Sequence, residues 1–164
     1  MAHAAFPQVL SAFLASEAHA QTRPSALFSE RELKTLELLV DVILPETDTP
    51  AASTAGTHRF IDLALSACAS DRQREVFRAG IADLQARGFD TANEQQRAAL
   101  LAARAEQDIA LAYDDSFFKI LKDYTLVGYF HSEVGATQAL AYEKIPGGYE
   151  ADIPLAPTQK AWAI

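Results

Sequence analysis

The chain has 164 residues, of which 49% are hydrophobic and 22% are charged, and its net charge at pH 7 is -8. This length and composition are typical of one folded domain with its own core, and they exclude a disordered chain. The negative charge argues against nucleic-acid binding, because affinity for phosphate backbones comes from clustered Lys and Arg. The single cysteine, Cys68, excludes an internal disulfide framework and a multi-cysteine metal site. No apolar run reaches the roughly 20 residues of a membrane-spanning helix.

Residues 1–24 are predicted to be a unit separate from the helical domain, which spans residues 25–164. Ala18, His19 and Ala20 have the small-x-small form of a signal-peptidase site, but no positively charged region precedes the apolar stretch before them. Two interpretations stay open. The segment is a remnant of an export signal, or it is an amphipathic helix whose apolar residues are Phe6, Val9, Leu10, Phe13 and Leu14.

The helical domain is predicted to be an all-α, single-domain, irregular bundle of about five to seven helices with an extended C-terminal tail. Apolar residues recur at helical spacing, and no segment shows convincing strand alternation. Ser29 and Glu32 have the spacing of a capping box, and Pro45 ends the helix that they begin, since proline cannot donate a backbone hydrogen bond. The predicted elements are a helix over 29–44, a loop over 45–56, helices over 57–69 and 70–87 (stopped by Gly88), a surface helix over 93–108, a central helix from 114 or 115 to 130, a short helix over 132–140 and an irregular tail from about 145.

The sequence lacks the common catalytic and cofactor-binding motifs. Its glycines form no phosphate-binding loop, dinucleotide-binding pattern or nucleophile elbow. His58 with Asp62, and His131 with Glu133, have spacings that could hold a metal, but two ligands per cluster are too few. We therefore predict no catalytic, cofactor-binding or metal-binding residue in this chain, and a metal-dependent helical enzyme using His58 or His131 is the alternative.

Three further features have a structural interpretation. Asp114 and Asp115 could act as an acid–base pair, but adjacent acids are also typical of the cap and first turn of a helix, which we favour. Cys68 is predicted to be a small buried thiol, because no His or cationic pair stands beside it. Gly128 and Gly135 each cost a helix about 1 kcal/mol relative to Ala, so we expect a packing reason for both.

Aromatic residues mark the last third of the chain. Those at helical spacing are predicted to be core, and the alternative is a ligand pocket in a stand-alone helical small-ligand-binding protein; they are Phe117, Phe118, Tyr124, Tyr129 and Phe130. Those in the tail stand on a segment rich in Pro and Gly that cannot form a packed layer. The tail therefore lies across this chain's own helices or across a partner, through Tyr149, Ile153, Leu155 and Trp162.

Two ordered sets of residues resemble a known family. The first is the run FFxxLxxYTLxGYFxSExG from Phe117 to Gly135, followed by Tyr142 and by PGxY from Pro146 to Tyr149. The second is ILPxxDTP from Ile43 to Pro50, followed by AG at 55–56 and FID at 60–62. Together they cover most of residues 27–163 and resemble the small, third subunit of gluconate 2-dehydrogenase.

The resemblance implies a helical, cofactor-free and non-catalytic subunit. Its partner would be a large flavoprotein of the glucose-methanol-choline (GMC) oxidoreductase type that carries FAD, and a cytochrome subunit with haem c can be a third member. Such complexes oxidise sugars or sugar acids on the periplasmic side, and related small subunits accompany glucoside 3-dehydrogenases.

The resemblance also implies that the small subunit escorts the folded flavoprotein during export, often through a twin-arginine signal. No Arg-Arg pair precedes Ala20 in this chain, so the export route stays open. We predict partner contacts, but no membrane span and no nucleic-acid contact. The predicted partner-binding residues are Phe130, His131, Tyr142, Pro146, Tyr149, Ile153, Leu155 and Trp162.

Overall fold

The computed structural model describes residues 26–141, 157 and 159–162. These residues form an all-α structure, as predicted, and the β pairing found among them is one isolated bridge between Ala141 and Trp162. The elements are α2 (Glu30–Ile43), α3 (Thr57–Cys68), α4 (Asp71–Ala86), the 3₁₀ turn η1 (Phe89–Thr91), α5 (Glu94–Asp108), the 3₁₀ turn η2 (Tyr113–Asp115), α6 (Phe117–Phe130) and the short π-helix η3 (Gly135–Ala139).

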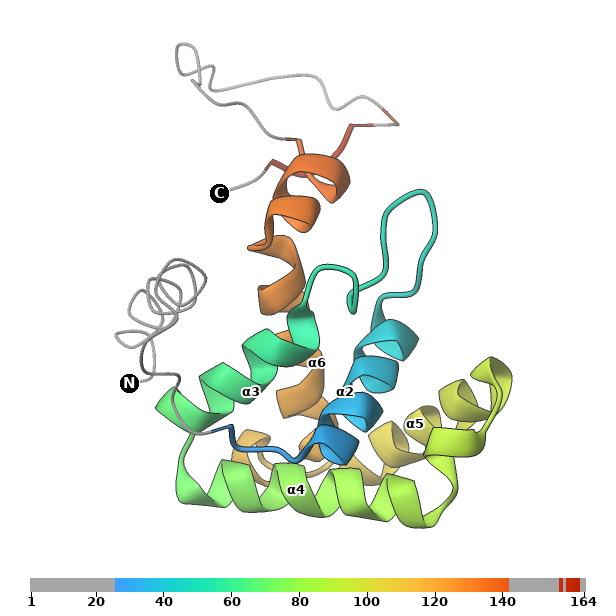
Figure 1. The fold of residues 1–164 in the computed structure, drawn as a ribbon, viewed down its shortest axis with the longest axis vertical. Helices are drawn as coiled ribbons and strands as arrows, with labels where there is room; N and C mark the ends of the chain where they lie inside the picture. The colour runs from blue at the N-terminus through green and yellow to red at the C-terminus, as the bar shows by residue number, and fades with distance from the viewer. Residues whose placement is uncertain (1–25, 142–156, 158, 163–164) are drawn as a thin grey trace.

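Helix α6 is the centre of the bundle. It contacts α2, α3, α4 and α5, which confirms the prediction that the helix ending at residue 130 is central. Helix α4 crosses the lower end of the molecule in Figure 1, and α2 and α3 stand above it. At the opposite end, η3 continues beyond α6, and the loop between α2 and α3 projects on the same side.

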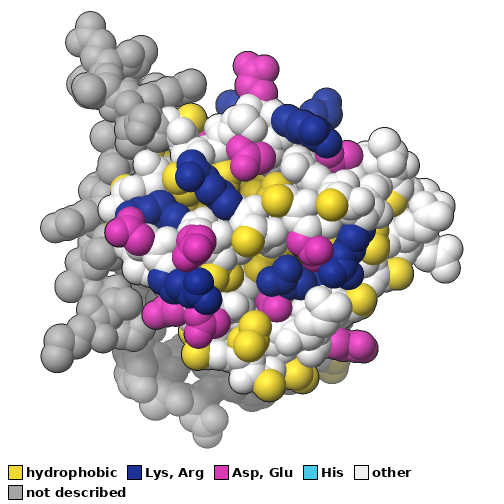
Figure 2. Space-filling view, turned by 90° about the horizontal axis from the view of Figure 1, so that it is seen from below, with side chains coloured by type: hydrophobic (Ala, Val, Ile, Leu, Met, Phe, Trp, Pro, Cys, Tyr) yellow, Lys and Arg dark blue, Asp and Glu magenta, His cyan; other side chains and the backbone are white. Residues whose placement is uncertain are grey.

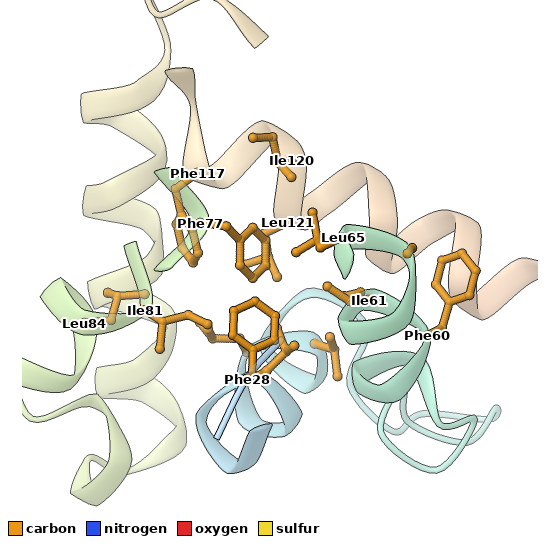
Figure 3. Close-up of a cluster of buried hydrophobic side chains, with 14 of the residues drawn as sticks. Phe28, Phe60, Ile61, Leu65, Phe77, Ile81, Leu84, Phe117, Ile120 and Leu121 are labelled. Carbon is orange, nitrogen blue, oxygen red and sulfur yellow. The ribbon is translucent and has the colours of Figure 1, made fainter. Parts of the chain in front are cut away.

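The core is an aromatic stack surrounded by aliphatic side chains (Figure 3). Phe77 of α4 lies between Phe28 and Phe117, with ring centroids 5.6 Å and 5.1 Å away. Phe117 also lies against Gly80, where an added Cβ would come within 2.2 Å of the Phe117 ring. The helices meet closely here because one of them has no side chain at the contact. Further fully buried core residues are Leu36, Leu39, Val40, Ile61, Leu65, Ile81, Leu84, Phe89, Ile120 and Leu121.

Polar side chains set the helix starts. The capping box predicted at Ser29 and Glu32 is present, and Ser70 with Gln73 and Asn93 with Gln96 form two more. Each box satisfies backbone N–H groups that a first helical turn leaves without partners. The C-terminal stop predicted after α4 is also confirmed, since Gly88 has a φ of 81°, a conformation that favours glycine.

The start of α6 differs from the prediction. We expected Asp114 or Asp115 to cap this helix, but they lie in η2 and the cap is Ser116, whose hydroxyl accepts a hydrogen bond from the Lys119 amide at 3.1 Å. The two carboxylates instead face α4. Asp115 pairs with Arg72 at 2.8 Å, and Asp114 accepts a hydrogen bond from Gln73 at 2.8 Å. Contacts with residues of α4, more than 40 positions earlier in the sequence, therefore accompany the later start of α6.

Gly128 and Gly135 have the packing reasons that we expected. A Cβ on Gly128 would come within 2.6 Å of the Phe60 ring, so α3 and α6 approach closely at this point. A Cβ on Gly135 would lie 1.9 Å from the backbone oxygen of Tyr129. The chain therefore folds back tightly on the end of α6, and η3 begins there.

Hydrogen bonds connect the segments beyond the end of α6. The Tyr129 hydroxyl donates to the Pro50 carbonyl at 2.9 Å and so connects α6 to the loop before α3. The Ala141 amide donates to the Ala161 carbonyl at 2.7 Å, and the Lys160 ammonium donates to the Gln138 carbonyl. The described end of the tail therefore returns to this chain's own residues 138–141.

Candidate partner-binding surface

The structure describes three of the eight predicted partner-binding residues. Phe130 is half-buried and lies edge-on against Tyr129, with ring centroids 5.3 Å apart. His131 is exposed, and its Nδ1 lies 2.9 Å from the Val127 carbonyl at the end of α6. Trp162 is 56% exposed although its backbone pairs with Ala141. The others lie outside the described residues: Tyr142, Pro146, Tyr149, Ile153 and Leu155.

These three residues belong to the same end of the molecule but have different environments. Phe130 packs against the hydrophobic core, whereas His131 and Trp162 face solvent. A large aromatic side chain that is half exposed on a paired backbone can contact another protein without prior rearrangement. Among the three, Trp162 therefore retains the strongest case as a contact residue.

One of the side chains considered as metal ligands, Asp62, has a structural role. The Asp62 carboxylate accepts hydrogen bonds from the Leu27 and Phe28 amides at 2.9 Å and 3.0 Å, which holds the chain before α2 against α3. Burial raises the pKa of Asp62, and these two hydrogen bonds oppose that effect. Burial lowers the pKa of the half-buried His58. Within the described part of the chain, no three His, Cys, Asp or Glu residues are grouped as a metal site requires.

Cys68 corrects another prediction. Its side chain is exposed at the last residue of α3, where the chain turns into α4, and is not the buried thiol that we expected. The helical pattern suggested burial because Ala and Leu surround Cys68 in sequence, but the turn after α3 leaves this position on the surface. Desolvation by the surrounding protein raises the pKa of the thiol, which favours its unreactive protonated form.

The aromatic residues of α6 are core residues, as predicted. Phe117 and Tyr129 are buried, and Phe118, Tyr124 and Phe130 are partly buried against the same core. Within the described part of the chain, two shallow grooves lie elsewhere, both along α5. The larger has a volume of about 570 Å³ and runs between the end of α4 and α5, past Gly88, Ala92 and Leu100. The smaller, of about 420 Å³, lies at the start of α5. Both are open to solvent rather than enclosed by aromatic side chains.

The surface on the α4 side of the molecule carries positive and negative charges in similar measure. Figure 2 views the molecule from the α4 side, where Lys and Arg are interspersed with Asp and Glu. On α4 these charges pair locally, as Arg72 does with Glu75, Arg74 with Asp71 and Arg87 with Asp83. Such exposed pairs contribute little to stability because solvent screens them, but they keep the surface polar.

One loop departs from this polar surface, and the sequence analysis missed it. Residues 109–113, Ile-Ala-Leu-Ala-Tyr, run from the end of α5 to the first residue of η2 and are all exposed. The described residues include four exposed large hydrophobic side chains, and three lie in this loop. They are Ile109, Leu111 and Tyr113, which are 76%, 40% and 39% exposed, and the fourth is Trp162. The sequence feature that could have indicated this loop is the apolar run between Asp108 and Asp114, which does not follow helical spacing.

A buried carboxylate holds both ends of this apolar loop. Asp108, the last residue of α5, accepts hydrogen bonds from the Phe118 amide at 2.8 Å, the Ser116 hydroxyl at 3.2 Å and the Arg104 guanidinium at 2.9 Å. Arg104 lies over the Phe117 ring, 5.4 Å from its centroid. The end of α5 and the start of α6 are thereby fixed to each other.

The described residues define a small all-helical structure with a hydrophobic core and an exposed apolar loop. None of the described helices is both long and apolar enough to cross a membrane. Residues 30–147, more than half of the chain, match the family described as gluconate 2-dehydrogenase subunit 3, and the chain belongs to this family. It is thus related to a subunit of a dehydrogenase complex. No curated protein and no solved structure gives a significant match.

Proposed function

We propose that the chain is the non-catalytic small subunit of an FAD-dependent, GMC-type dehydrogenase that oxidises a sugar or sugar acid. Membership of the subunit 3 family carries this proposal. The uses of its acidic side chains are in keeping with it. Asp62, Asp108 and Asp114 accept hydrogen bonds that hold segments of the chain together.

The proposed role is to stabilise the large subunit and to escort it during export to the periplasm. A protein that binds only the folded form of its partner stabilises that form by mass action, by about 2.7 kcal/mol at one hundred times the Kd. FAD belongs to the large subunit in this proposal, and haem c belongs to a cytochrome subunit where one is present. No redox step is assigned to residues of this chain.

Co-expression with the cognate GMC-type flavoprotein tests the proposal. We expect the two chains to co-purify as a complex whose flavin spectrum belongs to the large chain. Omitting the small chain should lower the yield of active, flavin-loaded large subunit, because its folded form loses a ligand. Measured yield and flavin content per large chain report the effect.

Two results would contradict the proposal. One is a large subunit that loads flavin, is exported and is active to the same extent without the small chain. The other is a small chain that stays monomeric in the presence of the flavoprotein and binds a small apolar molecule, which would favour a stand-alone ligand-binding protein.

A further inference from the structure

The loop over residues 109–113 combines exposure with order. Its side chains are apolar and exposed, whereas its backbone is held from several sides. The Lys119 ammonium donates to the Ile109 carbonyl at 3.2 Å and to the Leu111 carbonyl at 2.7 Å. The Leu111 amide donates to the Asp108 carbonyl at 3.1 Å. The protein has therefore fixed the shape of an apolar surface that its own core does not use.

An ordered apolar loop is suited to contact with another protein. Exposed apolar groups that cluster on an otherwise polar surface mark interaction sites, and a fixed loop loses little conformational entropy on binding. Tyr113 adds an aromatic ring with a polar end, a combination enriched at interface hot spots. Its hydroxyl interacts with the Asp123 carboxylate, and burial together with the nearby acidic groups raises the pKa of Tyr113.

The charge of the chain and of the residues around the loop indicates which kind of molecule can bind there. The whole chain has a net charge of -8, so two copies repel each other, and a surface of anionic lipid repels the chain as well. The loop itself is flanked by Glu106, Asp114 and Asp123, while Lys119 is held by the loop carbonyls. Arg104 and Arg72 also lie near the loop, but they pair with Asp108 and Asp115, and Lys122 follows in α6. A protein face that is apolar at its centre and carries Arg or Lys at its edge complements this surface.

We infer that residues 109–113 form a docking surface for the flavoprotein large subunit, with Ile109, Leu111 and Tyr113 in an apolar depression and a basic side chain of the partner beside Asp114 and Asp123. The choice of partner rests on the proposed function. The surface is distinct from the predicted contact at Trp162, which stands on the tail after η3. Two separate contacts would let a small protein hold a large one in a single orientation.

The test is the affinity of the purified chain for the purified large subunit, measured by calorimetric titration. Ile109→Ser should weaken binding by about tenfold, the effect expected of an apolar contact residue near an interface centre. Ile109→Lys should weaken it more than Ile109→Glu, because the facing edge is basic. Gln95→Ser, at an exposed position near the other end of α5, should stay within about twofold of the parent chain.

Binding of the parent chain and binding of Ile109→Ser separate an error in this surface from an error in the proposed function. If the parent chain does not bind the flavoprotein, the proposed function and this surface are both wrong. If the parent binds and Ile109→Ser binds equally well, only this surface is wrong. Two other results also overturn it. A parent dimer that Ile109→Ser dissociates means that the loop meets a second copy, and a lower Tm of the isolated variant means that this chain covers the loop itself.

Discussion

The helical bundle differs from the segments at the C-terminal end of α6, which are the loop before α3 and the residues after α6, in how it is held together. In the bundle, side chains such as Phe77 and Phe117 are fully buried, and helices approach so closely that Gly80 has no room for a Cβ. At the C-terminal end of α6, single hydrogen bonds connect these segments, such as that from the Tyr129 hydroxyl to the Pro50 carbonyl. A packed core resists local change because many contacts are lost together, whereas a hydrogen-bonded connection can open alone. The two regions should therefore respond differently to substitution.

The largest effect is expected from Phe117→Ala in the bundle. Removing this ring leaves a cavity against Phe77 and Gly80, and we expect the free energy of unfolding to fall by about 3–5 kcal/mol. Urea unfolding followed by circular dichroism measures the change. Phe118→Ala is the matched control. The Phe118 ring is only partly buried, so its removal should lower the free energy of unfolding by less. Equal losses for the two variants would mean that the buried stack does not dominate stability.

A smaller and more local effect is expected from Tyr129→Phe at the C-terminal end of α6. The variant loses the hydrogen bond to Pro50, which should cost about 1 kcal/mol while the ring stays buried. Hydrogen exchange should become faster at the amides of Ala52 and Gly56 in the connected loop and stay unchanged in α4. Uniformly faster exchange would show that the two regions open as one unit.

The smallest effect is expected from pH at the start of α3. His58 stands in the first turn of α3, and burial lowers its pKa in the folded state. The unfolded chain therefore binds a proton more readily, so this residue makes stability fall as pH decreases below about 6.5. Thermal unfolding between pH 7.5 and 5.5 measures it, and His58→Gln should reduce the slope. An unchanged slope would assign the pH dependence to other groups.

The sequence correctly predicted features that depend on local pattern, such as the position of α2 and the cap at its start. Helical spacing and the Ser29 capping box placed α2, and the apolar run ending at residue 130 identified the central helix. It did not predict what depends on distant partners. The start of α6 follows from contacts of Asp114 and Asp115 with α4, more than 40 positions earlier in the chain. Helical periodicity carries no information about such pairs.

The candidate surface was only partly predictable for the same reason. Trp162 could be named because an aromatic residue on a Pro- and Gly-rich tail has no core of its own to join. Residues 109–113 were missed because an apolar run between two helices is equally typical of a buried connection. Its exposure depends on Asp108, whose carboxylate turns inward and leaves the following apolar side chains outside. Sequence alone does not indicate which of two neighbouring residues is buried.

The contacts of Asp108 also differ from the Tyr129 contact at the C-terminal end of α6 in the length of chain between the bonded residues. Its hydrogen bond to the Phe118 amide spans 10 residues, whereas the bond from Tyr129 to Pro50 spans 79. Loop-closure entropy grows with the logarithm of that length, so the Asp108 contact costs on the order of 2 kcal/mol less to close. The hydrogen bond of Asp108 that holds residues 109–113 can therefore form between nearby residues, before residues far apart in the sequence come into contact.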